Sequence, residues 1–260
     1  MNNLILGNNL EILKTFESNS FDGGVTSPPY NKKGHSGKLV KEVIYNNISD
    51  NLPEDLYQKN QIEILNELYR IIKPGCSFFY NHKIRWNNGD FIHPMDWLRK
   101  TNWIIRQEII WDRQIAANIR GWRFWQTDER IYWLYKPIDK NKIGKELLSK
   151  HSLLTSIWKI RPEQKVNHPA PFPLEIPVRC LYSVLNNEKA SVIDPYMGSG
   201  TTGVACNFLG YNFTGIDISE EYIKYANERI KNYLSEKETF DNEIKKHCVI
   251  KSYKDRKKKS

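Results

Sequence analysis

The sequence has few cysteines and no long apolar run, and these absences exclude several classes of protein. Its cysteines, Cys76, Cys180, Cys206 and Cys248, lack the short paired spacings of a zinc site, so no metal is expected. A chain of 260 residues with an apolar core does not need a disulfide framework, and reduced thiols are expected. No segment approaches the roughly twenty apolar residues of a membrane span, and the first ten residues do not resemble a signal peptide. We therefore expect a cytoplasmic protein that does not bind membranes.

Acidic side chains are outnumbered by basic ones, 30 against 39, which gives a formal net charge of +9. This balance favours a polyanionic partner, because each neutralised phosphate releases condensed counterions. Charge alone is weak evidence, since many basic proteins bind no nucleic acid. The length predicts one sizeable core with a smaller lobe rather than several independent domains.

Segments that end at turn residues alternate with segments of helical spacing. The predicted strands are residues 21–26, 191–193 and 212–216, and the predicted helices are residues 56–72, 201–209 and 222–234. The first helix is predicted to end at Lys73-Pro74-Gly75. This alternation predicts an α/β protein with a mostly parallel sheet and helices on both faces.

The middle and the end of the chain differ from the rest in composition. The stretch from Trp86 to Trp158 combines tryptophans with many arginines, and we expect an insert that faces a partner. Most of its tryptophans are nevertheless expected in the core of that lobe; they are Trp97, Trp103, Trp111, Trp122, Trp125 and Trp133. Residues 251–260 hold six lysines or arginines without apolar periodicity, which predicts a disordered basic tail.

A glycine-containing segment, Asp194 to Thr202, lies between a predicted strand and a predicted helix. There the backbone can approach a ligand closely, and the helix N-terminus offers free N–H groups that suit a carboxylate. The segment has neither the Gly-Lys-Ser/Thr ending of a P-loop nor the glycine spacing of a dinucleotide site. Asp217 follows the next strand, where an acid can accept both hydroxyls of a ribose. Either segment alone could be an ordinary turn, but the two in series are far more specific.

A stiff turn, Ser27-Pro28-Pro29-Tyr30, follows the strand at residues 21–26. Its two prolines hold a hydroxyl, a carbonyl and an aromatic ring in fixed relation, and such a set can grip an amino group. Proline-rich turns beside an aromatic residue are common, so this motif gains its value from its place at a strand end.

On these motifs the chain resembles the amino-methyltransferases of DNA from bacterial type II restriction-modification systems, in their β-group arrangement. The same layout continues in further segments: residues 6–10, residues 72–75, residues 123–129 leading to Tyr132-Trp133, residues 158–161 and residues 168–173. The resemblance covers about residues 4 to 235. The catalytic turn precedes the cofactor loop, and this order is typical of the β group.

The resemblance implies a Rossmann-like class I methyltransferase fold with a seven-stranded, mostly parallel sheet and a target-recognition insert. Residues 1–110 and 165–240 would form the catalytic and cofactor-binding domain. Residues 111–164 would form the insert, and residues 241–260 a basic tail.

The resemblance also implies S-adenosylmethionine as the cofactor. The residues expected around it are Leu6, Asn8, His168, Ala170, Pro171, Phe172, Asp194, Pro195, Gly198, Gly200, Thr201, Thr202, Asp217, Ile218 and Ser219. Asn8 departs from the family, which often has an aspartate there to accept a hydrogen bond from the adenine of the cofactor. An asparagine can still accept through its carbonyl oxygen, although without the charge.

The expected reaction is methylation of the N6 amino group of adenine after base flipping, with Ser27, Pro28, Pro29 and Tyr30 as catalytic residues. The Ser27 hydroxyl and the Pro28 carbonyl would hold the amino hydrogens, and Tyr30 would stack on the base. N4-cytosine methylation is an alternative, because in the resembling family a serine at the first motif position is commoner among cytosine enzymes. Asn31 and the overall layout favour adenine. A catalytically silent DNA-binding module is a third hypothesis.

The expected partner is double-stranded DNA, contacted by basic residues that follow the catalytic turn and by arginines of the insert. They are Lys32, Lys33, His35, Arg120 and Arg123. A cognate restriction endonuclease would share the target sequence without needing to bind this chain, and a homodimer is possible. No cysteine follows a proline in a nucleophile-bearing turn, which argues against methylation of cytosine C5.

Overall fold

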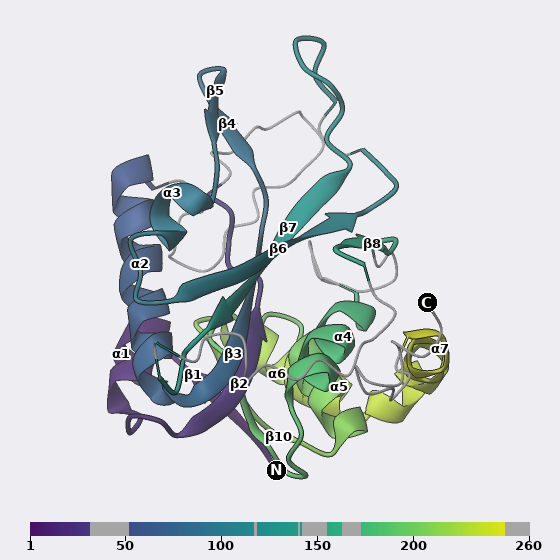
Figure 1. Ribbon diagram of the computed structural model, residues 1–260. Coiled ribbons are helices and arrows are strands. Elements are labelled where there is room, and N and C mark those ends of the chain that lie inside the picture. The colour runs from purple at the N-terminus through teal and green to yellow at the C-terminus, as the bar shows by residue number, and fades with distance from the viewer. Residues whose placement is uncertain (32–51, 117–118, 140, 142–154, 163–172, 248–260) are drawn as a thin grey trace.

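An eight-stranded sheet runs through the residues described by the computed structural model, which are 1–31, 52–116, 119–139, 141, 155–162 and 173–247 (Figure 1). The strands lie in the order β1-β10-β9-β2-β3-β7-β6-β8. Their bounds are β1 Asn2–Leu6, β2 Phe21–Thr26, β3 Ile72–His82, β6 Ile104–Asp112, β7 Asp128–Tyr135, β8 Ile157–Lys159, β9 Ser191–Asp194 and β10 Asn212–Asp217. A separate hairpin consists of β4 Arg85–Asn87 and β5 Asp90–Ile92.

Helices cover both faces of this sheet, as the alternating pattern predicts (Figure 1). They are α1 Asn9–Thr15, α2 Glu54–Ile71, α3 Met95–Leu98, α4 Glu175–Val184, α5 Thr201–Leu209, α6 Glu220–Lys231 and α7 Lys237–His247, with a 3-10 turn at Tyr233–Glu236. One apolar core lies under α1, α2 and α3, and a second lies under α4, α5 and α6. The three strands predicted from the sequence are all present. The helix expected to reach residue 234 ends at Lys231, and the 3-10 turn follows it.

The sheet is mostly parallel, as predicted, but it has one strand more than expected. Neighbours from β1 to β3 run parallel, whereas β7 is antiparallel to both β3 and β6. The extra strand is β8, whose three residues pair in parallel with β6 at the edge. Trp158 buries its ring there at 5% exposure, and its indole N–H donates to the Thr155 carbonyl. This burial explains why so short a segment joins the sheet.

The predicted insert boundaries, residues 111–164, need correction because they include two strands of the main sheet. β7 lies between β3 and β6, and its apolar residues Ile131 and Leu134 are fully buried. Between β6 and β7, the described residues 113–116 and 119–127 form a loop that leaves the sheet. Most tryptophans are buried or partly buried, as expected; Trp122 and Trp125, both in this loop, are exposed.

The predicted basic tail also starts too early. Residues 241–247 belong to α7, which packs on α4 through a buried ion pair. Glu243 is 3% exposed and accepts from the guanidinium of Arg179, Oε2 to Nη2 3.0 Å. A charged pair of this kind needs the helix in place, because either charge alone would be costly to bury. Residues 248–260 lie outside the described part of the chain.

The five neighbouring parallel strands, β1 to β3 in the sheet order, bring their carboxyl ends to one edge of the sheet. β9 pairs with β2, yet the chain continues from β9 towards β10 on one side and from β2 towards β3 on the other. Such a reversal leaves a crevice outside the strand ends, where ligands bind in open α/β sheets. Thr26, Asp194 and Asp217 end the strands that meet at this edge.

Candidate active site

Asp194 connects the predicted catalytic strand with the predicted cofactor loop. The residue has no exposed surface, and its carboxylate accepts from the hydroxyls of Thr26 and Thr202, both at 2.7 Å. It also accepts from the Tyr196 backbone N–H at 3.1 Å. Burial raises the pKa of Asp194 to about 6, although these hydrogen bonds oppose the shift. The end of β2 and the start of α5 are therefore held together by one buried side chain.

The loop before α5 forms a cradle of the kind that the sequence predicts. Gly198 and Gly200 have φ angles of +51° and +79°, a region that favours glycine. A Cβ on Gly200 would lie 2.9 Å from the Cβ of Ala226, so the close packing with α6 also requires glycine. Gly200 caps α5 without a side chain, which leaves the N–H groups of the first turn free of side-chain capping. This arrangement suits the carboxylate of an amino-acid moiety.

Asp217 ends β10 beside this cradle. Its two carboxylate oxygens accept from the backbone N–H groups of Gly198 and Ser219, each at 2.9 Å. Burial raises its pKa. The remaining lone-pair capacity of the carboxylate can accept a ribose hydroxyl. The chemistry of these donors and acceptors fits S-adenosylmethionine, which has a carboxylate, an amino group and two ribose hydroxyls.

The other predicted cofactor residues fall into three groups. Leu6 lies opposite Asp217 in the β1–β10 register, and the Pro195 carbonyl accepts from the Asn9 side chain at 3.3 Å. Asn8 caps α1, and its side-chain oxygen accepts from Leu10 N and Glu11 N at 3.0 and 3.2 Å. A hydrogen bond from the cofactor would compete with this cap. The remaining predicted residues His168, Ala170, Pro171 and Phe172 lie outside the described chain, whereas Thr201, Ile218 and Ser219 lie at the cradle.

The predicted catalytic turn is tied to two more strands by a chain of polar contacts. The Ser27 hydroxyl lies 2.9 Å from the Tyr30 hydroxyl, which donates to Glu129 Oε2 at 2.8 Å. Asn81 Nδ2 donates to Ser27 Oγ at 3.1 Å and to Tyr30 at 2.7 Å. Asn81 lies on β3 and Glu129 on β7, and both are buried. Arg113 forms an ion pair with Glu129 at 3.3 Å.

Tyr30 stays protonated in this environment. Burial raises its pKa well above the ordinary value, and the negative charge of Glu129 raises it further. The contacts of Ser27 within the described chain are therefore a phenol and an amide, and neither is a general base. This surrounding suits a hydroxyl that positions a substrate rather than a nucleophile.

A second set of contacts fixes one carbonyl of the turn and leaves another available. The Tyr57 hydroxyl donates to the Pro29 carbonyl at 2.7 Å and lies 2.7 Å from His82 Nε2. The ring of His82 also faces Tyr30, with 4.7 Å between ring centroids. Among the described residues, none donates to the carbonyl of Pro28. Of the two proline carbonyls, Pro28's is thus the one available to a substrate.

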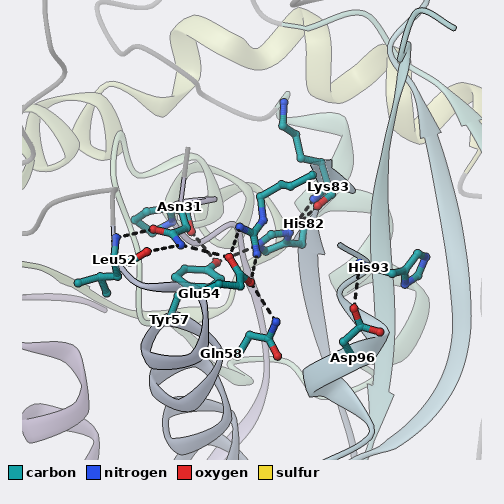
Figure 2. A network of polar contacts seen from close by, with 11 residues as sticks. Asn31, Leu52, Glu54, Tyr57, Gln58, His82, Lys83, His93 and Asp96 are labelled. Carbon is teal, nitrogen blue, oxygen red and sulfur yellow. Dashed lines mark hydrogen bonds and ion pairs between the residues drawn. The ribbon is translucent and has the colours of Figure 1, made fainter. Parts of the chain in front are cut away.

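Asn31 closes the turn in the left-handed region, with φ of +51°. Its side chain bonds both backbone groups of Leu52, Nδ2 to O at 3.0 Å and N to Oδ1 at 2.7 Å (Figure 2). It also donates to Glu54 at 3.3 Å, and Glu54 pairs with the guanidinium of Arg85 at 2.7 Å. Figure 2 shows Asn31, Glu54, Tyr57 and His82 gathered around this support. Asn31 therefore has a structural role in the turn.

The predicted DNA-binding arginines lie in the loop between β6 and β7. Arg120 is exposed, and the Arg123 guanidinium lies 4.0 Å from the Trp86 ring centroid on β4. Phe124 is 99% exposed. Figure 1 shows this loop and the β4–β5 hairpin projecting at the same end of the molecule. The predicted contacts Lys32, Lys33 and His35 lie outside the described residues.

Sequence reasoning misses four residues that support the catalytic turn: Tyr57, Asn81, His82 and Glu129. They lie about 30 to 100 positions from Ser27; the sheet order brings Asn81, His82 and Glu129 to it, and the packing of α2 brings Tyr57. The available signal is modest, namely polar residues at the end of the apolar strand β3 and at the start of β7. In the part of the chain that the structure describes, no three potential metal-binding side chains cluster and no helix is long and apolar enough to cross a membrane.

A family profile described as DNA methylase matches residues 21–228, which span both the catalytic turn and the cofactor cradle. The type II methyltransferase M.HpaI from Haemophilus parainfluenzae is 26% identical over 268 residues, covering 94% of this chain and 78% of that protein. Another type II relative is much longer, and the chain spans 27% of its length.

Two solved structures share the fold. The PvuII DNA methyltransferase, described as cytosine-N4-specific, has a TM-score of 0.67 at 17% identity, covering 90% of this chain and 92% of that one. A DNA modification methylase from Thermus thermophilus, solved in complex with S-adenosyl-L-methionine, has a TM-score of 0.64 at 23% identity, covering 90% and 96%. At these identities the likeness shows the fold alone, and it confirms the predicted methyltransferase architecture.

Proposed function

The chain belongs to the DNA methylase family of N6 and N4 amino-methyltransferases, and from this premise we propose that it methylates the N6 amino group of adenine in double-stranded DNA. The family uses S-adenosylmethionine, whose sulfonium supplies the methyl group. One observation carries the proposal: the buried Asp194 joins Thr26, directly before the catalytic turn, to Thr202 in the cofactor cradle. The acceptors of the turn and the cradle therefore lie at the same sheet edge.

The chain's own contribution to the chemistry is to hold the target amino group. An exocyclic amino nitrogen is a poor nucleophile because its lone pair is delocalised into the ring. Ser27 Oγ and the Pro28 carbonyl are the acceptors available for its hydrogens, and holding them favours a tetrahedral nitrogen whose lone pair is no longer delocalised into the ring. The Tyr30 ring, fixed at its hydroxyl by Glu129, offers a stacking surface for the base.

The target nitrogen lies inside the duplex, so the base must leave the stack at a cost of about a few kcal/mol. We place the DNA on the end of the molecule that carries the β6–β7 loop. The exposed Arg120 and the stacked Arg123 supply positive charge there, and Trp122, Phe124 and Trp125 supply exposed aromatic surface. This loop is our proposed target-recognition segment.

The choice of adenine rests on the resemblance in overall layout, and Ser27 favours a second candidate. In the resembling family a serine at this position is commoner among N4-cytosine enzymes, whereas adenine enzymes usually have an aspartate. In this chain a carboxylate still lies near the Ser27 hydroxyl. Glu129 accepts a hydrogen bond from Tyr30, and Tyr30 is hydrogen-bonded to Ser27. N4-cytosine methylation needs the same grip on an amino group, and the modified base decides between the two.

Transfer of a labelled methyl group from S-adenosylmethionine to DNA tests the proposed activity. Wild-type protein should label duplex DNA, and Ser27→Ala should slow single-turnover transfer by about 100- to 1000-fold, the usual cost of losing one oriented hydrogen-bonding partner of a reacting group. Cofactor affinity should stay near the wild-type value, because the hydrogen bonds of Ser27 within the described chain go to Tyr30 and Asn81 and not to the cradle. Wild-type rates from Ser27→Ala, or a covalent adduct at Ser27, would contradict the assigned role.

A further inference from the structure

The hydrogen bonds around Tyr30 have a fixed direction. A carboxylate has no hydrogen to give, so the Tyr30 hydroxyl must donate to Glu129 Oε2 across 2.8 Å. A phenol has only one O–H hydrogen, and the Tyr30 oxygen can therefore only accept its other bonds. It accepts from the Ser27 hydroxyl at 2.9 Å and from Asn81 Nδ2 at 2.7 Å.

This direction decides what Ser27 can do. Its hydrogen is used by Tyr30, so its oxygen can only accept from any other group. One lone pair accepts from Asn81 Nδ2 at 3.1 Å, and one remains. If the direction were reversed, Tyr30 would donate to Ser27, and the serine hydrogen would be free to point at the target nitrogen. A donor at that point would compete for the lone pair that has to react.

We propose that Glu129 is a positioning residue that sets the direction of this chain of hydrogen bonds and thereby keeps Ser27 an acceptor for the amino group. This inference rests on the proposed function. Glu129 acts through Tyr30 and Ser27 and does not itself touch the base.

The two carboxylate oxygens of Glu129 have different partners. Oε1 pairs with the Arg113 guanidinium at 3.3 Å, and Oε2 accepts from Tyr30. Asn81 Nδ2 also approaches Oε2, at 3.3 Å. The amide orientation of Asn81 follows from this contact, because the flipped amide would place its oxygen against the carboxylate. Three donors thus converge on a carboxylate that is 7% exposed.

Glu129→Gln is the matched perturbation because it changes one oxygen to an amino group. Arg113 needs an acceptor, so the glutamine oxygen should take the place of Oε1 and the amino group the place of Oε2. An amino group there donates to Tyr30 and reverses the chain. Single-turnover transfer should slow by about 10- to 100-fold, the rate equivalent of one hydrogen bond to a charged group. The affinities for S-adenosylmethionine and DNA should stay within about twofold, well below the effect of losing a hydrogen bond to a charged group.

Glu108→Gln is the control, because Glu108 lies on the neighbouring strand β6 and pairs with Arg130 at 2.8 Å, away from the chain that leads to Ser27. It makes the same chemical change to an ion-paired strand glutamate and should leave the transfer rate unchanged.

A double-mutant cycle with Ser27→Ala separates this role from a structural one. If Glu129 acts through Ser27, Glu129→Gln should cost nothing further once the serine hydroxyl is absent. If the loss of rate in the double variant equals the product of the two single losses, the proposal is overturned. Tyr30→Phe removes the central hydroxyl but keeps the ring, and it should reproduce the effect of Glu129→Gln; it carries the test if Glu129→Gln does not fold. If the wild type is active and either Glu129→Gln or Tyr30→Phe transfers methyl groups at the wild-type rate, this inference alone is overturned. If the wild type is inactive, the proposed function is overturned as well.

Discussion

Replacing Asp194 with asparagine should make the protein more stable at neutral pH and should flatten its dependence on pH. Asp194 is fully buried, and burial raises its pKa to about 6 from an ordinary value of 3.8. The folded state therefore holds this proton more tightly than the unfolded state does. The resulting stability is present below pH 3.8 and is lost as the pH rises through about 6.

The magnitude follows from the size of the shift. About two pKa units at 1.36 kcal/mol each give a loss of about 3 kcal/mol between pH 4 and pH 8. Asparagine avoids this loss and can keep the contacts, because its oxygen can accept from Thr26 and Tyr196 while its amino group donates to Thr202. The Thr202 hydroxyl only has to rotate in order to accept.

Urea denaturation of both proteins across pH 4 to pH 8, followed by tryptophan fluorescence, measures this effect. The variant should match the wild type to within about 1 kcal/mol near pH 4 and exceed it by about 3 kcal/mol at pH 8. Asp90→Asn, at the exposed tip of the β4–β5 hairpin, is the control and should not change the profile. A variant that is less stable at pH 8, or a difference that does not grow with pH, would refute the reasoning.

Three further predictions concern the cofactor, the DNA surface and the core. Asp217→Ala should weaken S-adenosylmethionine binding in titration calorimetry by at least about 1.5 to 3 kcal/mol, which is the contribution of one hydrogen bond to a charged group. An unchanged affinity would remove Asp217 from the site. Replacing Arg120 and Arg123 together with alanine should reduce the salt slope of DNA binding by about two units if both contact phosphate, and an unchanged affinity would show that they are structural. Gly24→Ala should destabilise the fold by about 1 to 3 kcal/mol in thermal denaturation, because a Cβ would lie 2.3 Å from the Ile193 carbonyl; a wild-type melting temperature would contradict the packing argument.

The sequence predicts the parts of this molecule that local chemistry determines. β2 and α5 have the predicted bounds because each meets a strong stop, the double proline after Thr26 and the glycine after Leu209. The cradle around Gly198 and Gly200 is equally local. By contrast, composition alone places β7 in an insert, because its aromatic and charged residues resemble those of the loop before it. Its place in the sheet depends on pairing with β3, which is distant in the sequence.

The catalytic turn illustrates the same limit. Ser27 and Tyr30 are evident from their motif, whereas Glu129 and Asn81 become part of the site only through the strand order β2-β3-β7. Asn8 shows a different case, in which a residue predicted at the cofactor also caps α1. A side chain that can serve two purposes is assigned by the local backbone, which the motif alone does not reveal.

The identity of the methylated base tests the central claim most directly. Wild-type protein, DNA and S-adenosylmethionine with an isotopically labelled methyl group are incubated together, the DNA is digested to nucleosides, and the labelled nucleoside is identified by mass spectrometry. We predict labelled N6-methyladenine in DNA. Labelled N4-methylcytosine in its place would contradict the assignment of adenine, and label confined to 5-methylcytosine would contradict the amino-methyltransferase mechanism built on Ser27 and Pro28.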